Sequence, residues 1–327
     1  MSCRIGFVGA GAVAERHARV LAGFPDVRLV AVTDPDQERR RSFARRHGGR
    51  AVPDLAALLD TGLDAAYVCV PAFAHGQPEE SIASAGVNLF VEKPLGLDWA
   101  TPHRVARLLD GTGVLAAVGH HWRYSATVRR AQRLLRDRPV RLLTGAWLDQ
   151  VPPSRWWAFR RRFGGQVVEQ AVHVLDLARL LCGEVTEVYA VTDQVPPHAP
   201  STDAAGATTA AVRFDSGAVG TLATTCVLGW RHRAGVEVCA DGLALLVTED
   251  GLECCEHGRT QHWSVDPAEA RRAADRAFVD AVLGRTDELL TSYPDALRTH
   301  RLACAIAGSA AQGRPIHFPG AAPGSGA

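Results

Sequence analysis

Short apolar runs alternate with amphipathic stretches over about the first 120 residues of the chain. Short runs bounded by polar residues are typical of buried strands, whereas apolar residues three or four apart are typical of helices. The predicted strands are 5–8, 29–33, 66–70, 89–91 and 115–118, and the predicted helices are 13–22, 37–46, 54–59, 78–85 and 101–109. Because strands and helices alternate, right-handed crossovers should form a parallel sheet with helices on both faces.

The pattern changes after Arg123. Helices are predicted over 126–138 and 167–181, a strand over 140–148, and a loop rich in Pro, Trp and Arg over 150–165. Strand-like runs follow at 187–192, 208–214, 218–226 and 236–240, with turn signals such as Asp215-Ser216-Gly217 between them. This pattern favours an antiparallel sheet with one face covered by helices. Two further helices are predicted over 267–283 and 294–312.

The change of pattern predicts an α/β chain with two folded domains. Residues 1–122 would form a doubly wound parallel-sheet domain, and residues 123–318 an α+β domain with a largely antiparallel sheet. Residues 319–327 are rich in Gly, Ala and Pro, a composition that predicts a disordered tail.

Composition and charge exclude several classes of partner. A net charge of +1 provides no long-range field for nucleic acid or an anionic membrane. No apolar stretch approaches the roughly 20 residues needed to cross a bilayer. We expect no signal peptide, because the N-terminus runs directly into a predicted strand. The 8 cysteines contain no C-x-x-C pair, so we expect reduced thiols in a cytoplasmic protein and no metal site.

A glycine-rich turn lies directly between the first predicted strand and the first predicted helix. Gly9-x-Gly11-x-x-Ala14 has the spacing of a dinucleotide-binding turn, in which the glycines permit a tight bend and close approach of a pyrophosphate. Asp34 ends the second predicted strand, where a carboxylate can bind the ribose hydroxyls of NAD. The first domain is therefore predicted to be a Rossmann domain that binds NAD. Arg39, Arg40 and Arg41 are close enough in sequence to reach a 2′-phosphate, which leaves NADP open.

A second group of chemically versatile residues lies in the predicted helix 167–181. Glu169 and His173 are four residues apart and would share a helix face with Asp176, so a carboxylate could orient a basic imidazole. An exposed acid–histidine pair without catalytic meaning has the same spacing. Metal ligation is rejected because no other cluster of His, Cys or Asp completes a coordination shell.

Lys93 is the only lysine among the 36 basic residues, and the other basic residues are all arginines. Arginine keeps its charge at every physiological pH, whereas a lysine ammonium can give up a proton. Lys93 follows a predicted buried strand in the sequence Glu92-Lys93-Pro94, and ligands of open α/β sheets bind beside such strand ends. A role in proton transfer is one interpretation, and chance retention is the other.

These motifs together resemble the glucose–fructose oxidoreductase/inositol dehydrogenase (Gfo/Idh/MocA) family over nearly the whole chain. The resemblance rests on the glycine turn with Asp34, on Val70-Pro71 followed by His75, on Glu92-Lys93-Pro94, and on the Gly164-Gly165 stretch that leads to His173. It implies that Lys93 and His173 are the catalytic pair, with Glu169 where the family usually has Asp. It also implies an open-faced second sheet that serves in a homodimer or homotetramer. The residues that the resemblance implies to line the cofactor are Gly9, Gly11, Asp34, Pro71, His75, Glu92 and Lys93. Further cofactor candidates are Ala12 and Val13 in the glycine turn, and His121 with its neighbour His120, just past the last predicted strand of the first domain.

The function predicted from this resemblance is hydride transfer between NAD(P) and a carbinol or carbonyl carbon of a sugar, cyclitol or related polyol. The candidate substrate residues are Arg123, Tyr124, Trp156, Trp157, Asp176 and His232. For each of them a packing role is an equal alternative. Two other functions stay open: a non-catalytic dinucleotide-binding sensor, and an enzyme that uses tightly bound NAD transiently for elimination or glycoside cleavage.

Overall fold

The computed structural model describes residues 2–193, 195–198 and 202–318, so the predicted tail 319–327 lies outside the described residues. The chain divides into two compact units. The first comprises Met1–His121 and Arg271–Leu297, and the second comprises Trp122–Ala270 and Arg298–Ala327. Residues 271–297 were predicted to belong to the second domain, whereas this segment packs with the first unit.

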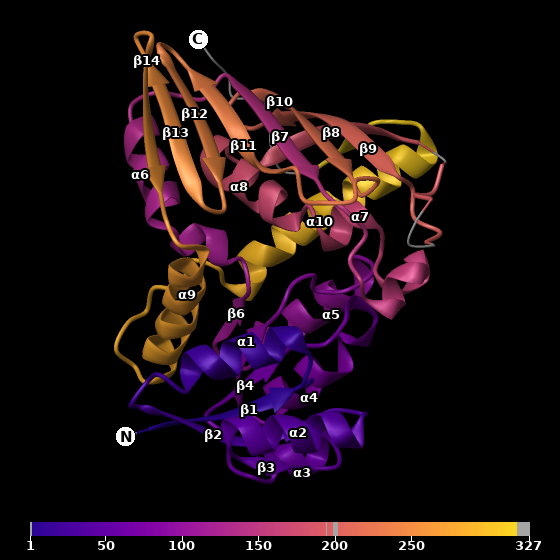
Figure 1. The fold of residues 1–327 in the computed structure, drawn as a ribbon, viewed down its shortest axis with the longest axis vertical. Helices are drawn as coiled ribbons and strands as arrows, with labels where there is room; N and C mark the ends of the chain where they lie inside the picture. Colours follow the sequence, from indigo (N-terminus) through magenta and orange to yellow (C-terminus); the bar gives the residue numbers. More distant parts are fainter. Residues whose placement is uncertain (1, 194, 199–201, 319–327) are drawn as a thin grey trace. The chain divides into compact units, whose positions relative to one another are not determined.

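A six-stranded parallel sheet forms the centre of the first unit, in the order β3-β2-β1-β4-β5-β6 (Figure 1). The strands are β1 (Cys3–Val8), β2 (Val27–Thr33), β3 (Arg50–Ala51), β4 (Ala65–Val68), β5 (Asn88–Val91) and β6 (Ala116–Val118). β3 was not predicted, because two residues carry no recognisable pattern. Since β1 lies between β2 and β4, the strand order reverses there, and the carboxyl ends of these strands form the edge where such sheets bind ligands.

Both faces of this sheet are covered, because neighbouring residues of each strand point to opposite sides. Ile5 and Phe7 pack in one cluster with α1, α2 and α9, whereas Val8 packs in another with α3, α4 and α5. The helices are α1 (Ala12–Leu21), α2 (Gln37–His47), α3 (Leu55–Leu59), α4 (Gln77–Ser84), α5 (Ala100–Leu109) and α9 (Pro267–Val282). The near-continuous apolar strands predicted from the sequence are those of a doubly covered parallel sheet.

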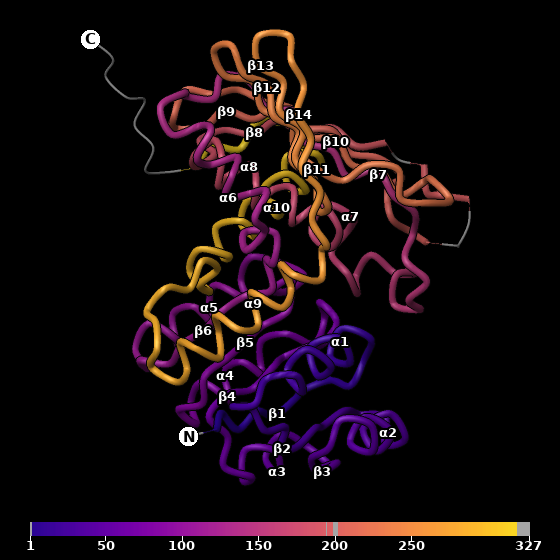
Figure 2. The backbone as a smooth tube through the Cα atoms, turned by 60° about the vertical axis from the view of Figure 1, so that its left-hand side comes forward, coloured from indigo at the N-terminus to yellow at the C-terminus, as the bar shows by residue number. Residues whose placement is uncertain are grey.

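The late segment 271–297 completes both apolar layers of the first unit. Phe278 and Val279 of α9 join the cluster under α1 and α2. Tyr293 and Leu297, at the start of α10 (Tyr293–Gln312), join the opposite cluster. Figure 2 shows this segment beside the elements of the first unit. Its helical periodicity was readable, but the surface it covers was not.

A nine-stranded, mostly antiparallel sheet forms the second unit, in the order β14-β13-β12-β11-β7-β10-β9-β8-β15. The strands are β7 (Leu142–Leu148), β8 (Val185–Thr192), β9 (Ala207–Phe214), β10 (Val219–Thr225), β11 (Arg233–Ala240), β12 (Leu243–Thr248), β13 (Gly251–Glu256), β14 (Arg259–Ser264) and β15 (Ile316–His317). β10 pairs with β7 in the parallel direction. Helices α6 (Ala126–Leu135) and α8 (Val172–Cys182) and the later turns of α10 pack on one face, as Figure 1 shows.

The helix predicted over 167–181 is interrupted. α7 (Gln166–Glu169) ends before α8 begins, and Gln170 and Ala171 lie between them. The Ala171 amide donates to the Gln166 carbonyl at 3.3 Å, a wide turn of the π type that shifts the regular hydrogen-bond ladder. Glu169 and His173 therefore do not lie in one uninterrupted helix, as the predicted helix 167–181 required, and their pairing stays a prediction.

Candidate active site

Gly9 makes the tight turn after β1. Its φ is +93°, and its amide donates to the Thr33 carbonyl at 2.8 Å. A Cβ at this position would lie 2.3 Å from the backbone oxygen of Cys69, so a side chain cannot be accommodated without a shift of the backbone. Glycine is therefore required by both conformation and space.

Gly11 has a different environment, because a Cβ there would meet no heavy atom within 4 Å. It is the N-cap of α1, whose next two residues are Ala12, exposed, and Val13, partly buried. The unpaired amides of this helix N-terminus face an open space that suits a pyrophosphate.

Asp34 is buried at the carboxyl end of β2 and is fixed by two backbone amides. One carboxylate oxygen accepts from Ala10 at 2.9 Å, and the other accepts from Asp36 at 2.8 Å. The Arg39 guanidinium lies 3.8 Å from the same carboxylate, and Arg40 donates to the Asp34 carbonyl. The acid thus lies against the glycine turn, as expected of a ribose-binding carboxylate.

The segment after β4 contains Pro71 and His75 on either side of a short 3₁₀ turn (Ala72–Ala74). The buried His75 ring meets Glu79 through Nδ1, and the same carboxylate accepts from the Gly76 amide at 2.7 Å. The His75 Nε2 atom is buried and has no hydrogen-bond partner within the described part of the chain. An oriented ring with an available nitrogen at this sheet edge suits contact with a bound cofactor.

Glu92 and Lys93 follow β5 directly. Glu92 is buried, and its carboxylate contacts His17 Nε2 at 2.9 Å and the Arg16 guanidinium at 3.5 Å. Burial alone would raise the pKa of Glu92, but the hydrogen bond from His17 and the nearby positive charges lower it to about 2. Lys93 is partly exposed, and its amide donates to Glu92 Oε2 at 3.2 Å.

Two residues near Glu92 were not predicted: His17, and Asp275, which contacts His17 Nδ1 at 2.7 Å. The signal for His17 was present, because a histidine three residues after Ala14 lies on the buried face of α1. No sequence signal connected it with Asp275 on α9. His120 is buried and His121 partly buried after β6, at the same edge of the sheet.

In the second unit, His173 lies in the first turn of α8 beside two aromatic rings, whose centroids are themselves 6.1 Å apart. Its ring is stacked with Trp122 at 5.5 Å and with Trp147 at 6.2 Å between ring centroids. His173 is 6% exposed. The two indoles were not predicted from the sequence, and they restrict the orientation of the imidazole. Glu169, at the end of α7, is partly buried.

Arg123 and Asp176 form a buried bidentate ion pair. Arg123 Nε and Nη2 each donate to an Asp176 oxygen at 2.7 Å, and Thr299 donates to the same carboxylate at 2.9 Å. Arg179 donates to Thr299 at 2.5 Å, which extends the network. The Arg123 guanidinium and the Asp176 carboxylate, both candidates for substrate binding from the sequence, thus bind each other within this network. The alternative packing role accounts for both residues.

The other candidate substrate residues have different environments. Tyr124 and Trp157 are buried, and Trp157 stacks on Phe163 with ring centroids 4.1 Å apart. Trp156 is partly buried, whereas His232 is exposed directly before β11. Of this group, Trp156 and His232 present side-chain surface that a ligand could contact.

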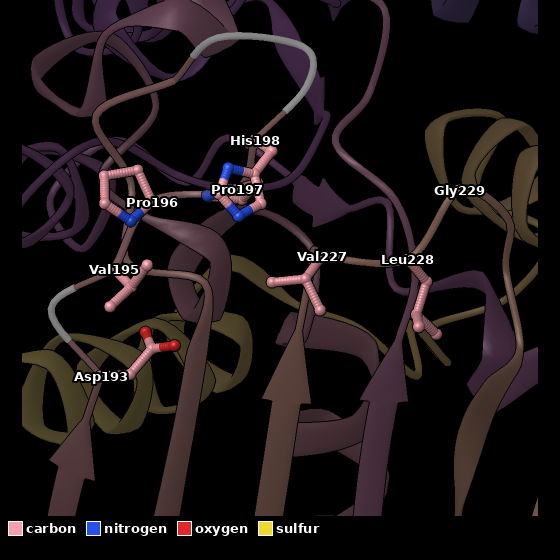
Figure 3. Close-up of a pocket in the computed structure, with 8 residues that line it drawn as sticks. All are labelled: Asp193, Val195, Pro196, Pro197, His198, Val227, Leu228 and Gly229. Carbon is pink, nitrogen blue, oxygen red and sulfur yellow. The ribbon is translucent and has the colours of Figure 1, made fainter.

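A hollow of about 350 Å³ lies beside the loops that follow β8 and β10 (Figure 3). It is lined by Asp193, Val195, Pro196, Pro197, His198, Val227, Leu228 and Gly229. None of the residues predicted for catalysis or cofactor binding lines this hollow. Among the described residues, no group of three or more His, Cys, Asp or Glu side chains is placed to hold a metal ion. No helix in the described ranges is long and apolar enough to cross a membrane.

Comparison with known proteins assigns both parts of the chain. Residues 3–120 match "Oxidoreductase family, NAD-binding Rossmann fold", and residues 129–243 match "GFO/IDH/MocA C-terminal domain". The chain belongs to the Gfo/Idh/MocA oxidoreductase family. The predicted resemblance, the predicted fold class and the NAD-binding character of the first domain are thereby confirmed.

Individual curated relatives have low sequence identity to this chain and match only part of it. Inositol 2-dehydrogenase of Rhizobium meliloti is 31% identical over 190 residues, which are 56% of this chain and 56% of that protein. The 2,7-anhydro-N-acetylneuraminate hydratase of Mediterraneibacter gnavus is 28% identical over 192 residues, 57% of this chain and 50% of that protein. In these matches the chain spans about half the length of the curated relatives.

The fold extends over the whole chain. The solved structure of levoglucosan dehydrogenase in complex with NADH and levoglucosan superposes with a TM-score of 0.88. The match covers 98% of this chain and 100% of that chain at 18% sequence identity. At that identity the likeness establishes the fold alone.

Proposed function

We propose that this chain is an NAD-dependent oxidoreductase that acts on a carbinol or carbonyl carbon of a sugar, cyclitol or related polyol. The observation that carries the proposal is the position of Lys93. This lysine directly follows β5, two strands from the Gly9 turn, at the carboxyl edge of the dinucleotide-binding sheet. A titratable ammonium at that edge is suited to contact a substrate oxygen beside the cofactor.

The residues of the first unit fit a dinucleotide. Gly9 makes the bend, the open space beside Gly11 admits the pyrophosphate, and Asp34 holds the ribose hydroxyls. Ala12 and Val13 contribute helix N-terminal amides, while Pro71, His75, Glu92 and His121 line the rest of the cofactor. NAD is preferred to NADP because the buried Asp34 carboxylate repels a 2′-phosphate.

When bound, the nicotinamide supplies the acceptor or donor of hydride. In oxidation, His173 takes the hydroxyl proton and Lys93 donates a hydrogen bond to the substrate oxygen, which stabilises its alkoxide character. In reduction these roles reverse. Glu169, at the end of α7, takes part by orienting His173.

Substrate recognition is assigned to Trp156 and His232, the candidates with available surface, because an aromatic face packs on sugar C–H groups and an imidazole binds hydroxyls. Trp157, Tyr124, Arg123 and Asp176 support the site by packing and by the buried ion pair.

A second function is favoured by one specific finding: one of the relatives is named as a hydratase rather than a dehydrogenase. A chain of this family that used bound NAD transiently would turn over substrate without net reduction of added NAD. Persistence of a dinucleotide through purification would support this function. A non-catalytic sensor would bind the dinucleotide and turn over nothing.

Self-association through the second sheet forms part of the proposal. Its helix-free face presents exposed apolar or small side chains, among them Leu142, Tyr189, Val191, Val219 and Ala223. Exposed apolar faces of this kind mark protein–protein contacts, so we propose a homodimer or homotetramer.

A cytoplasmic location is also part of the proposal. Burial raises the pKa of the Cys3 and Cys182 thiols to about 12, and these inert free thiols suit a cytoplasmic protein.

The test is a panel of sugars, cyclitols and polyols, incubated with NAD and separately with NADP, and followed by the absorbance of the reduced nicotinamide. The proposal expects NAD-dependent absorbance with at least one class. Substrate consumption without net absorbance would support the transient function. Tight NADH binding with no consumption of any substrate would support the sensor.

A further inference from the structure

His17 is a buried histidine between two buried carboxylates of the first unit. Its Nδ1 lies 2.7 Å from Asp275 Oδ1 on α9, and its Nε2 lies 2.9 Å from Glu92 Oε1. A carboxylate only accepts hydrogen bonds, so both ring nitrogens must donate. A ring that donates from both nitrogens is an imidazolium, and the hydrogen-bond geometry therefore assigns a positive charge to His17.

Burial and charge agree with this assignment. The side chains of His17 and Asp275 are 5% and 0% exposed, so water does not screen their interaction. Burial alone would lower the pKa of His17, but Asp275 and Glu92 raise it to about 9. The other titratable or charged groups around the pair are Arg16 of α1, Tyr67 of β4, and Cys69 and Lys93 at the strand ends.

The Glu92 carboxylate is constrained from the side of the strand ends as well. Oε2 accepts the amide of Lys93 at 3.2 Å. A Cβ at Gly119, directly after β6, would lie 2.7 Å from Oε1 and 3.0 Å from Oε2, so the carboxylate packs against that backbone. Glu92 therefore connects the His17 imidazolium of α1 with two strand-end features, the amide of Lys93 and the backbone at Gly119.

We propose that His17 is a positioning residue, which as an imidazolium clamped by Asp275 holds the Glu92 carboxylate and thereby fixes the backbone at Lys93. The consequence for catalysis rests on the proposed function, whereas the positioning itself is a property of the chain alone. Removing the imidazolium leaves two buried carboxylates without their shared cation, a costly arrangement that favours protonation or rotation of Glu92. Either change loosens the hydrogen bond to the Lys93 amide.

The sole lysine supplies a direct probe. Labelling the full chain with ¹⁵N-lysine gives one backbone amide signal, that of Lys93. In wild type the signal should stay constant from pH 5 to about 8 and shift with a midpoint near 9, as His17 loses its proton. A signal that shows no transition with that midpoint would overturn the proposal, and this readout needs no variant that folds and no bound cofactor.

Variants then test the route through Glu92. His17→Gln should shift or broaden the Lys93 amide signal and abolish its transition near pH 9. The matched control is His47→Gln, which removes a histidine of α2 that pairs with Glu15 of α1. This control should leave the signal unchanged. In a Glu92→Gln background, His17→Gln should have little further effect. Additive effects of the two substitutions would mean that His17 does not act through Glu92.

A kinetic comparison connects positioning with turnover. His17→Gln should lower kcat/KM by up to about 100-fold, mainly through kcat, because a small displacement of a reacting group is enough. An unchanged Lys93 signal with reduced turnover would overturn the positioning role. If His17→Gln displaces the Lys93 signal but wild type turns over no substrate of the panel, the positioning role is supported and the proposed function is contradicted. The two failures are therefore distinguishable.

Discussion

Gly9 and Gly11 serve different physical needs within one turn. At Gly9 the backbone has a positive φ, and a Cβ would lie 2.3 Å from the Cys69 carbonyl oxygen. At Gly11 a Cβ would meet nothing within 4 Å. The fold therefore requires glycine at position 9, whereas glycine at position 11 leaves space for a ligand.

We expect Gly9→Ala to lower the free energy of unfolding by about 1–3 kcal/mol, because it combines a strained φ with a backbone clash. Gly11→Ala should unfold like wild type but bind NADH more weakly, because the new methyl group occupies the space proposed for the pyrophosphate. Thermal unfolding and NADH fluorescence titration measure the two effects. Equal NADH affinity in Gly11→Ala and wild type would remove the pyrophosphate from this space.

Arg123 provides the second prediction at the scale of residues. Arg123→Met leaves the Asp176 carboxylate buried without its bidentate partner, so we expect a loss of about 3–5 kcal/mol in the free energy of unfolding. Arg133→Met, on the exposed side of α6, is the matched control and should change little. Denaturant unfolding measures both. A stable Arg123→Met protein with a raised KM would instead assign Arg123 to the substrate.

At the scale of elements, His17 connects α1 with α9 and with the end of β5. Its raised pKa stabilises the fold fully below pH 6.5, and this contribution is lost as the pH rises through about 9. The lowered pKa of Glu92 stabilises the fold above pH 4.5, and that contribution is lost as the pH falls through about 2. The pair thus contributes fully between pH 4.5 and 6.5.

We therefore predict that wild type loses on the order of 3 kcal/mol of unfolding free energy, relative to His17→Gln, between pH 6.5 and above 9. Urea unfolding of both proteins at each pH measures the difference. His47→Gln serves again as the control for removing a histidine. A pH-independent difference between wild type and His17→Gln would show that His17 carries no charge in the folded protein.

The elements also show what the sequence could and could not predict. Five of the six strands of the parallel sheet were predicted because each is a short apolar run, whereas the two-residue β3 was not. β12 and β13 were missed although Asp250-Gly251 marks their turn, and β14 is an edge strand with most side chains exposed on both faces, so it has no alternation to detect. The interruption at Gln170 and Ala171 depends on hydrogen bonds that spacing alone does not specify.

The candidate site divides in the same way. Gly9, Gly11, Asp34 and Lys93 could be predicted because a local motif places each at a strand end. Asp275 could not, because its partner His17 is distant in sequence. The two indoles beside His173 come from β7 and from the turn before α6, and only the fold brings them together.

At the scale of the whole molecule, the helix-free face of the nine-stranded sheet is the surface proposed for self-association. Thr221 and Ala223 lie at its centre on β10, between β7 and β9. We expect Ala223→Arg to shift the chain toward monomers, because an arginine in the middle of a packed sheet face brings a desolvated charge. Gln132→Arg, exposed on α6, is the control, and sedimentation velocity measures both. An unchanged oligomer in Ala223→Arg would exclude this face.

The measurement that tests the account most directly compares wild type and Lys93→Arg on one substrate from the panel, by the rate of NAD reduction. Arginine keeps the positive charge but does not release its proton. The account predicts that Lys93→Arg folds, binds NADH, and loses turnover by about 100-fold or more. A Lys93→Arg protein as active as wild type would contradict it.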